Sequence, residues 1–362
     1  MGLDCARRGF GQVDSLTQAA LGATIAEAGF RRRLGGRAVV FGALAATLPD
    51  LDVFLRAGGE WAVVAYHRGL SHSLPFLAAL SPLLAWAARR WALSGRAWWR
   101  AGRGGLGGSS FSAWWALAAA ALLTHPLLDL FTSYGTQILW PFSDRRYAVD
   151  AVAIVDPLVT LPLLAALFLA WRRHGDRVAA GVSWAALALA SGYIGLGYLH
   201  SIEARAEARE RLHSRGVAVA ELRAVPTLFN TWLWRVMARD GKGGLYLGHV
   251  SLLEAGRGSF VGLHNSGGAL AEAALASREG RLFERFAMGW VSTRLETDDD
   301  GVASVHLDDQ RYGLISRPEV TIFSAEARFD REGRLLEVID PMSYPPIDGL
   351  AELRELGRLL GG

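Results

Sequence analysis

The sequence predicts a mainly α-helical membrane domain followed by a small α+β domain outside the membrane. Three observations predict it: apolar runs long enough to cross a bilayer, an uneven distribution of arginine between loops, and a change to strand patterning after Pro226. Apolar residues make up 51% of the 362 residues and charged residues 20%, which excludes a disordered, coiled-coil or collagen-like chain. Cys5 is the only cysteine, which excludes a disulfide framework and a cysteine-based zinc site.

The two parts of the chain differ in charge. Residues 1–200 contain 18 Arg and 11 acidic residues, whereas residues 201–362 contain 20 Lys and Arg residues against 24 acidic ones. The arginines form no basic face with interleaved aromatic residues, so we expect no nucleic-acid partner. We divide the chain into an N-terminal extension (1–13), a transmembrane domain (14–200), a helical connector (201–225) and an extramembrane domain (226–362).

Five or six membrane helices are expected. A helix needs roughly 20 mostly apolar residues to cross a bilayer. Five segments meet or approach this length: 38–55, 72–88, 111–131, 151–171 and 178–199. A sixth, 15–30, is expected to span, re-enter or lie at the interface, with Asp14 as its N-cap. Tryptophans near the ends of these runs favour a membrane protein over the alternative, a large soluble protein with buried helices.

The arginines predict the topology. Twelve lie in three alternate loops and four lie in the other two, and cytoplasmic loops retain arginine because positive charge resists translocation. The arginine-rich loops, expected in the cytoplasm, are 31–37, 89–110 and 172–177. The chain after residue 200 is then expected on the outer, periplasmic side of the inner membrane. Cysteines placed at Ser94 and Gly175 should be labelled from the cytoplasm, and one at Gly301 from outside.

Acidic and histidine residues of the membrane domain gather at the outer ends of its helices. They are Asp50, Asp52, His67, His72, His125 and Asp129. Ionisable groups at membrane depth are costly and usually mark function. We therefore expect His67, His72, His125, Asp129 and at least one of Asp50 and Asp52 to converge on one cavity. Imidazole and carboxylate ligands suit zinc, with manganese and iron as alternatives, and such ions generate a nucleophile from water near neutral pH.

The spacing of these residues adds detail. His125 and Asp129 are four residues apart, so a helix places them on one face. We expect His67 in a loop above the site and His72 in the first turn of its helix. Asp144, Asp150 and Asp156 follow in the next loop. We interpret Asp150 as a solvated turn residue and expect Asp156, which precedes a proline, to orient a ligand.

The spacing of apolar residues changes after Pro226, from a pattern typical of helices to one typical of strands. We expect residues 201–225 to be helical and 269–287 to form a helix. Strands are expected at 228–238, 244–253, 288–296, 302–308 and 319–329, with turns at Asp240–Gly244, Asp299-Asp300-Gly301 and Glu332-Gly333. No group of residues in this part predicts catalysis.

Several motifs resemble those of a known family. They are DSLTQAALGA at 14–23, LPDLDV at 48–53, HRGLSHSL at 67–74, HPLLDLFTSYG at 125–135 and WPFSDRRY at 140–147. In order and spacing the chain resembles the YdjM-like family of membrane-bound metal-dependent hydrolases, and PTLFNTWLWRV at 226–236 is similar to its longer members. The resemblance implies that the six acidic and histidine residues named above bind metal and act in catalysis. Gln18 stands where many members have His, and an amide is a weak neutral ligand.

The sequence therefore predicts a membrane-embedded, metal-dependent hydrolase acting at the outer membrane–water interface. Its expected substrates are lipids or lipid-linked esters, phosphoesters or amides, because the site lies at headgroup depth. The expected metal ligands are Gln18, Asp50, Asp52, His67, His72, His125 and Asp129. Asp50 is also expected to act in catalysis, with Arg68 and Arg145 stabilising an anionic transition state or anchoring helices at the interface. Two alternatives are a proton- or ion-coupled carrier and a non-enzymatic anchor with an outer binding domain.

Overall fold

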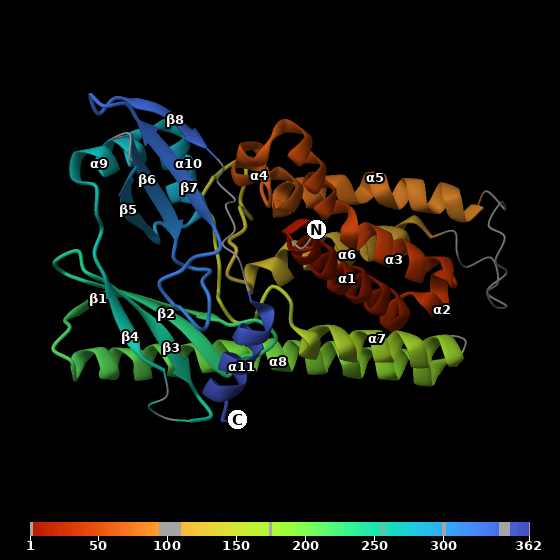
Figure 1. The fold of residues 1–362 in the computed structure, drawn as a ribbon. Helices are drawn as coiled ribbons and strands as arrows, with labels where there is room; N and C mark the ends of the chain where they lie inside the picture. Colours follow the sequence, from red (N-terminus) through yellow and green to blue (C-terminus); the bar gives the residue numbers. More distant parts are fainter. Residues whose placement is uncertain are drawn as a thin grey trace. The chain divides into compact units, whose positions relative to one another are not determined.

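The computed structural model describes residues 3–93, 110–173, 176–254, 256, 258–298, 302–339 and 348–361 (Figure 1). The three labelling positions Ser94, Gly175 and Gly301 lie outside these residues, as does the predicted turn at Asp299-Asp300-Gly301. The chain forms two compact units. The first consists of Met1–Phe54, Arg68–Val149 and Ile154–Leu196, and the second of Leu55–His67, Asp150–Ala153 and Gly197–Gly362.

The first unit is helical. Its elements are α1 (Leu3–Gly29), α2 (Arg31–Leu34), α3 (Arg37–Thr47), the 3₁₀ helix η1 (Leu48–Gly58, which continues into the second unit), η2 (Leu70–His72), α5 (Leu74–Leu93), α6 (Phe111–Leu130), α7 (Pro157–Arg172) and the first part of α8 (Arg177–His213). Every segment predicted to cross the membrane overlaps one of these helices.

The number of membrane helices differs from the prediction. Within the described residues, α6 and α8 are long and apolar enough to span a bilayer. Glu60–His72 and Leu74–Ala92 would form a third span if this pair, bent by 59°, counts as one. The helical membrane domain is thus supported with two or three candidate spans, and the count of five or six is not confirmed. The segments 38–55 and 151–171 are shorter as α-helices because α3 gives way to η1 at Leu48 and α7 begins only at Pro157.

The predicted start of the first helix is wrong. Helix α1 begins at Leu3 and runs through position 14, so Asp14 lies inside the helix and is not its N-cap. An N-cap residue has non-helical backbone angles and satisfies N–H groups that are free only in the first turn. The polar residue before the apolar run therefore does not mark a helix end here.

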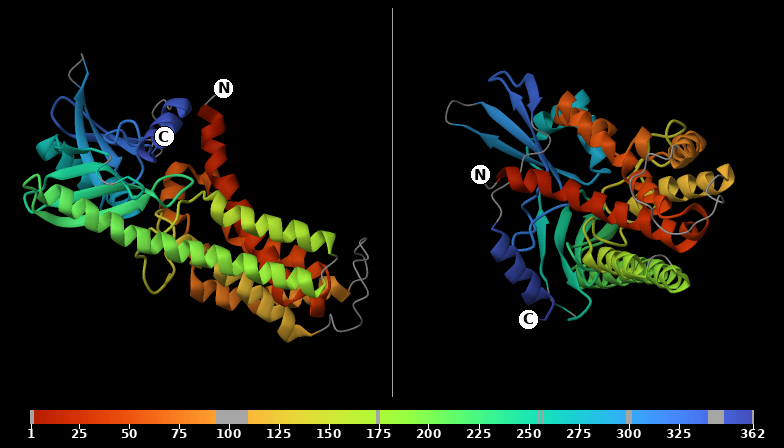
Figure 2. Two further views of the ribbon diagram at one scale, coloured as in Figure 1. Left: turned by 90° about the horizontal axis from the view of Figure 1, so that it is seen from below. Right: turned by 90° about the vertical axis from the view of Figure 1, so that its right-hand side faces the viewer.

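Two glycines allow α1 and α3 to touch through their backbones. A Cβ atom on Gly22 would lie 2.2 Å from the carbonyl oxygen of Gly42, and one on Gly42 would lie 2.4 Å from the carbonyl oxygen of Gly22. Neither position can carry a side chain without moving the helices apart. Figures 1 and 2 show α1 and α3 lying side by side. This contact fixes α1, which carries Gln18, against the helix that leads into Asp50.

Buried small and aromatic residues form the core beside this contact. Helices α1, α3, α5 and α6 contribute to it, and its members include Ala26, Phe41, Ala45, Ala85, Trp114, Leu117 and Ala121. The ring of Trp114 meets that of Phe41 edge to face at 5.5 Å between centroids. Helix α6 continues through Pro126 to Leu130, so His125 and Asp129 lie on one helix as predicted.

The second unit contains two four-stranded antiparallel sheets, each in sequence order; Figure 1 labels the strands. The first consists of β1 (Val219–Pro226), β2 (Leu233–Asp240), β3 (Leu245–Ser251) and β4 (Phe260–Leu263), and the second of β5 (Val291–Thr297), β6 (Ala303–Asp309), β7 (Ser324–Phe329) and β8 (Leu335–Ile339). The helices are α4 (Glu60–Tyr66), α9 (Gly268–Ala276), α10 (Arg278–Phe286), α11 (Gly349–Leu359) and the end of α8. An α+β arrangement was predicted, with fewer strands.

The predicted hairpin between β2 and β3 is confirmed. The Asp240 carboxylate accepts hydrogen bonds from the backbone N–H groups of Lys242 and Gly244, which closes the turn. The connector prediction is wrong in part, because α8 ends at His213 and residues 219–226 form β1. The single helix predicted at 269–287 is two helices, since the Ser277 hydroxyl accepts from the Gly280 N–H and starts α10.

Small residues on α8 pack against the first sheet. Ala204 and Ala208 share a buried cluster with Ala224, Trp234, Val236 and Val250. Alanine at these two positions lets the helix approach the large indole of Trp234, which is fully buried. The end of α8 and the sheet therefore form one packed body.

Candidate metal centre

Four separate elements of the first unit bring polar side chains together. Gln18 comes from α1, Asp50 and Asp52 from η1, His72 from η2, and His125 with Asp129 from α6. The imidazoles of His72 and His125 are fully buried, and Asp129 is 1% exposed. The Asp50 side chain is 16% exposed, so it is the member of this group that solvent reaches most easily.

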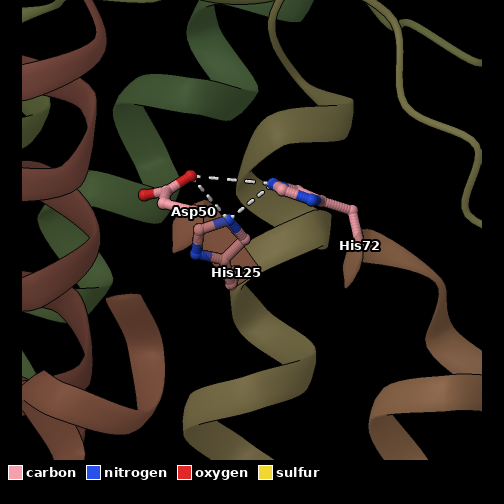
Figure 3. A group of neighbouring side chains, drawn as sticks. All are labelled: Asp50, His72 and His125. Carbon is pink, nitrogen blue, oxygen red and sulfur yellow. Dashed lines mark hydrogen bonds and ion pairs between the residues drawn. The ribbon is translucent and has the colours of Figure 1, made fainter. Parts of the chain in front are cut away.

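His72, His125 and Asp50 form the centre of the group (Figure 3). The two Nε2 atoms lie 3.0 Å apart, and Asp50 Oδ1 lies 3.4 Å from that of His125 and 3.7 Å from that of His72. The ring centroids are 4.7 Å apart, well inside the separation of about 8 Å that ligands of one metal or two adjacent metals permit. The predicted convergence of these two histidines is confirmed.

The outer nitrogen of each imidazole has its own acceptor. His125 Nδ1 lies 2.5 Å from the carbonyl oxygen of Ala46, which can only accept, so this nitrogen donates. His72 Nδ1 lies 3.0 Å from Ser71 Oγ and 3.3 Å from Asp52 Oδ2. Ser71 already donates its hydroxyl proton to Asp52 (2.7 Å), so its oxygen accepts from His72. In neutral rings both Nε2 atoms are then left with lone pairs, the tautomer of metal-binding histidines.

Asp129 completes this group from the α6 side. Its Oδ1 accepts from Gln18 Nε2 (3.1 Å) and lies 3.3 Å from Arg68 Nη2. Its Oδ2 lies 3.2 Å from His72 Nε2 and 3.5 Å from His125 Nε2, and within the described part of the chain it has no hydrogen-bond partner. A buried carboxylate oxygen needs a proton donor or a cation beside it, and the two Nε2 atoms are the nearest groups to this one.

These distances fit a tetrahedral metal centre. Metal–ligand bonds of about 2.0–2.1 Å give ligand atoms separated by roughly 3.4 Å at the corners of a tetrahedron. The three separations among the two Nε2 atoms and Asp50 Oδ1 are 3.0, 3.4 and 3.7 Å. His72, His125 and Asp50 therefore fit three corners of a tetrahedral divalent-metal site.

The predicted ligands Asp52, Gln18 and His67 lie outside the group of Asp50, His72 and His125. Asp52 accepts from Ser71 and from the Arg68 backbone N–H at 3.1 Å, so it lies at the outer edge of His72. Gln18 donates to Asp129 and to the His125 carbonyl (3.2 Å). His67 ends α4 and belongs to the second unit, whereas the group of Asp50, His72 and His125 lies in the first. Asp52 thus contacts the His72 ring, and Gln18 contacts Asp129 and the His125 backbone.

The two candidate arginines also differ. Arg68 is 2% exposed, has a φ of 56° and donates to Thr132 Oγ1 at 2.9 Å, with its guanidinium 4.9 Å from the centre of the Tyr134 ring. Arg68 therefore lies at Oδ1 of Asp129, whereas the two imidazoles lie at Oδ2. Arg145 is exposed and lies over the ring of Tyr147 at 5.5 Å.

The surroundings of Asp150 and Asp156 differ from those that the sequence predicted. Asp150 is 5% exposed and receives two hydrogen bonds of 2.8 Å from the Arg223 guanidinium, so the prediction of a solvated turn residue is wrong. Asp156 caps α7 through the Leu158 N–H (3.0 Å) and accepts from the Tyr193 hydroxyl (2.9 Å). These two contacts give Asp156 a structural role at the start of a helix.

Sequence reasoning did not find three groups that orient the ligands. Ser15 donates to Asp50 Oδ2 at 2.9 Å, Ser71 holds Asp52 and His72, and the Ala46 carbonyl fixes His125. Ser71 directly precedes His72 and Ser15 lies one helical turn before Gln18, which was a usable signal. A backbone carbonyl carries no signal in the sequence.

Comparisons with known proteins identify the family of the helical part of the chain. Residues 13–199 match the YdjM inner membrane protein family. Over 114 residues, 31% of this chain and 57% of the relative, the sequence is 37% identical to the inner membrane protein YbcI of Escherichia coli (strain K12). Over 131 residues, 35% of each chain, it is 26% identical to the uncharacterised protein YfhP of Bacillus subtilis (strain 168). The matched part thus spans just over half of YbcI and about a third of YfhP.

No solved structure matches this chain. The family match covers more than half of the 362 residues and includes every member of the His/Asp group. The resemblance found in the motifs is therefore confirmed, and the chain belongs to the YdjM inner membrane protein family.

Proposed function

We propose that this protein is a membrane-embedded, metal-dependent hydrolase. It would act on a lipid or lipid-linked ester or phosphoester at the outer face of the inner membrane. The observation that carries the proposal is the pair of facing Nε2 atoms, 3.0 Å apart, with each ring's Nδ1 bound to an acceptor. Two lone pairs do not face each other at this distance without a proton or a cation between them. The nearby carboxylates supply the negative charge that a divalent cation requires.

Each residue of the group then has a defined task. Asp50, His72 and His125 hold the ion, Asp129 adds a carboxylate beside the two imidazoles, and Asp52 and the Ala46 carbonyl orient the two rings. When bound, a zinc, manganese or iron ion would acidify a water molecule and polarise the scissile group. Asp50 is the most exposed of the four, so its carboxylate is placed to take a proton from water entering the site.

The Arg68 guanidinium is placed to stabilise negative charge at the site. Its guanidinium lies 3.3 Å from Asp129 Oδ1 and 2.9 Å from Thr132 Oγ1, and its burial strengthens its electrostatic effect. A guanidinium held in this way favours the negative charge that develops when water attacks an ester or phosphoester. Arg145, which is exposed and stacked on Tyr147, is a candidate for binding a headgroup at the surface.

The surface next to Asp50 favours an amphiphilic substrate. The neighbouring residues of η1 expose large apolar side chains: Leu51 by 52%, Val53 by 42% and Phe54 by 73%. A substrate that approaches Asp50 meets this apolar surface, which suits an acyl or prenyl chain better than a water-soluble molecule. The substrate class therefore follows from the contrast between a charged, buried group and an apolar approach.

A lipid hydrolysis assay tests the proposal. The purified protein, loaded with Zn²⁺ or Mn²⁺, is incubated in mixed micelles with phosphatidic acid, lysophosphatidylcholine and a prenyl diphosphate, and the products are measured by mass spectrometry. We expect product from at least one lipid, and a loss of roughly 100-fold or more in His125→Ala, because a ligand is removed. His264→Ala, at an exposed histidine of the second unit, should retain activity.

The result also separates the alternatives. A carrier or a non-enzymatic anchor would give no product with any lipid under conditions in which the metal is bound. Hydrolysis that is equal in wild type and His125→Ala would place the activity elsewhere and contradict the proposal.

A further inference from the structure

The loop between β1 and β2 holds an exposed aromatic residue in a strained conformation. Phe229 has a φ of 71° and is 44% exposed. A bulky side chain is unfavourable in this left-handed region, so the surrounding structure must hold it there. An apolar ring in contact with water gives no compensation for this cost. The combination suggests that the ring has a partner other than this chain.

Asn230 holds the loop in this conformation. Its Oδ1 accepts from the backbone N–H groups of Trp232 (2.9 Å) and Leu233 (2.8 Å). Its Nδ2 donates to Thr227 Oγ1 at 3.1 Å and to the Leu228 carbonyl at 3.0 Å. The Asn230 side chain is buried, and all four bonds lie within the turn. The strain at Phe229 is thus maintained by a rigid loop.

The next residue joins the loop to α8. The carbonyl oxygen and hydroxyl of Thr231 lie 2.9 and 3.2 Å from His200 Nδ1. The hypothetical Cβ of Gly197, one turn earlier on α8, would lie 3.1 Å from the Thr231 methyl group, so helix and loop are in close contact. The indole of Trp232 lies 6.0 Å from the His200 ring. The position of the loop is therefore fixed at residues 197–200 of α8.

This part of α8 is where the apolar run ends. Tyr198, Leu199 and Ile202 are exposed apolar residues around His200. From Glu203 onward the helix is rich in charge, with Arg205, Glu207, Arg209, Glu210 and Arg211. A membrane-crossing helix leaves the hydrocarbon where apolar side chains give way to charged ones. His200, and with it the loop, thus lies at the level where α8 leaves the bilayer.

We propose that the loop 227–232 dips into the membrane surface beside α8, with the Phe229 ring among the lipid chains just below the headgroups. Leu199 and Ile202 are exposed apolar residues on the part of α8 that the loop contacts, and they would face the same lipid. Aromatic rings at this depth stabilise a protein against the interface. The loop would act as a second attachment of the β-sheet domain to the bilayer, independent of whether the protein is a hydrolase.

Photo-crosslinking of the wild-type protein tests this proposal. The full chain is reconstituted into phosphatidylcholine–phosphatidylglycerol vesicles that contain a phospholipid with a diazirine near its ester bond. After irradiation and trypsin digestion, the peptide 224–235 should carry lipid adducts, located by fragmentation to residues 228–230. Peptide 335–354, which contains the exposed residues Leu336 and Leu353, is the matched control and should carry none. Absence of adducts from 224–235 would overturn the proposal.

A variant assigns the contact to the ring. Phe229→Gly keeps the backbone, because glycine accepts a φ of 71° without strain, and it removes the apolar side chain. The adducts in 224–235 should fall to the control level, while adducts on the spanning part of α8 stay unchanged. Adducts that remain at the wild-type level in this variant would show that Phe229 does not mediate lipid contact.

Discussion

His72 and His125 lie 53 positions apart in the sequence, and their Nε2 atoms lie 3.0 Å apart in the folded protein. Each ring is turned toward the other by a hydrogen bond on its far side, which His72 Nδ1 donates toward Ser71 and Asp52 and which His125 Nδ1 donates to the Ala46 carbonyl. The arrangement explains why LPDLD, HRGLSHSL and HPLLD occur together in one chain. One motif supplies a ring, another its acceptor, and a third the opposing ring.

The first prediction concerns the orientation of His72. Asp52→Asn removes the charge that accepts from Nδ1 and keeps the size of the side chain, so the ring loses its fixed tautomer. We expect roughly 10- to 100-fold weaker Zn²⁺ binding, measured by competition with a chromogenic chelator. Asp144→Asn, at an exposed acid, is the control and should bind Zn²⁺ as wild type does. Equal affinity in both variants would mean that Asp52 does not position the ring.

The second prediction concerns the helix crossing that sets Gln18 against η1. Gly22→Ala places a Cβ 2.2 Å from the Gly42 carbonyl oxygen, and the two backbones cannot yield without separating α1 from α3. We expect a loss of about 1–3 kcal/mol of stability, seen as a lower Tm of the purified protein. Gly181→Ala on α8 is the control, because a Cβ there meets nothing within 4 Å. A Tm for Gly22→Ala equal to that of the control would contradict the close contact.

The third prediction concerns Asp150. The Arg223 guanidinium makes two bonds of 2.8 Å with its carboxylate, and both groups are largely buried. Asp150→Asn leaves a buried arginine without its countercharge, which costs about 3–5 kcal/mol. Asparagine tolerates the positive φ at this position, so the backbone is not the cause. The Tm should fall, and the metal content of the folded protein should stay unchanged.

A different outcome would enlarge the proposed site. If Asp150→Asn retains its Tm and loses metal, the carboxylate acts on the metal centre and the structural account of Asp150 is wrong.

These residues also show what the sequence could and could not predict. The spacing of His125 and Asp129 predicts a shared helix face, and their oxygen and nitrogen atoms do approach to 3.5 Å. The helical and α+β parts were likewise predictable from hydrophobic period and turn residues. Local patterns of this kind survive folding because each depends on neighbours a few residues away.

Long-range pairings were harder to predict. Arg223 lies 73 positions from Asp150, so Asp150 looked like an ordinary turn residue. Strand β1 was missed because charged residues Glu221 and Arg223 interrupt its pattern, and Arg223 is buried only through its partner. The predicted number of spans is not confirmed, because apolar composition does not show where an α-helix begins, as at Pro157.

The fourth prediction concerns pH. Burial and the neighbouring Arg235 lower the pKa of His249 to about 3, whereas an unfolded histidine has a pKa of about 6.5. Below pH 6.5 the unfolded chain takes up a proton that the folded domain excludes, so the free energy of unfolding falls as the pH decreases. We expect a loss of about 2 kcal/mol between pH 7.5 and pH 5.

The variant His249→Leu checks this cause. It should flatten the dependence of Tm on pH between 6.5 and 5, measured by scanning fluorimetry. His264→Leu, at an exposed histidine, should keep the wild-type profile. A wild-type profile in His249→Leu would assign the pH dependence to other groups.

The fifth prediction concerns topology. Single cysteines are placed in a Cys5→Ser background at Arg32, in an arginine-rich loop, and at Gly241, in the β2–β3 turn; both positions are exposed. A membrane-impermeant maleimide should label Gly241→Cys in intact spheroplasts and Arg32→Cys only after lysis, because the arginine distribution predicts that residues 31–37 lie in the cytoplasm. The reverse pattern would place the second unit in the cytoplasm and contradict an outward-facing site.

The metal content of the purified protein tests the central claim most directly. Wild type, His72→Ala, His125→Ala and the control His264→Ala are purified without chelators from cells supplied with zinc, manganese and iron, and analysed by inductively coupled plasma mass spectrometry. We predict near-stoichiometric divalent metal in wild type and His264→Ala, and a loss to background in the two variants of the facing pair. Wild-type protein with no more metal than His72→Ala would contradict the metal centre and favour a carrier or an anchor.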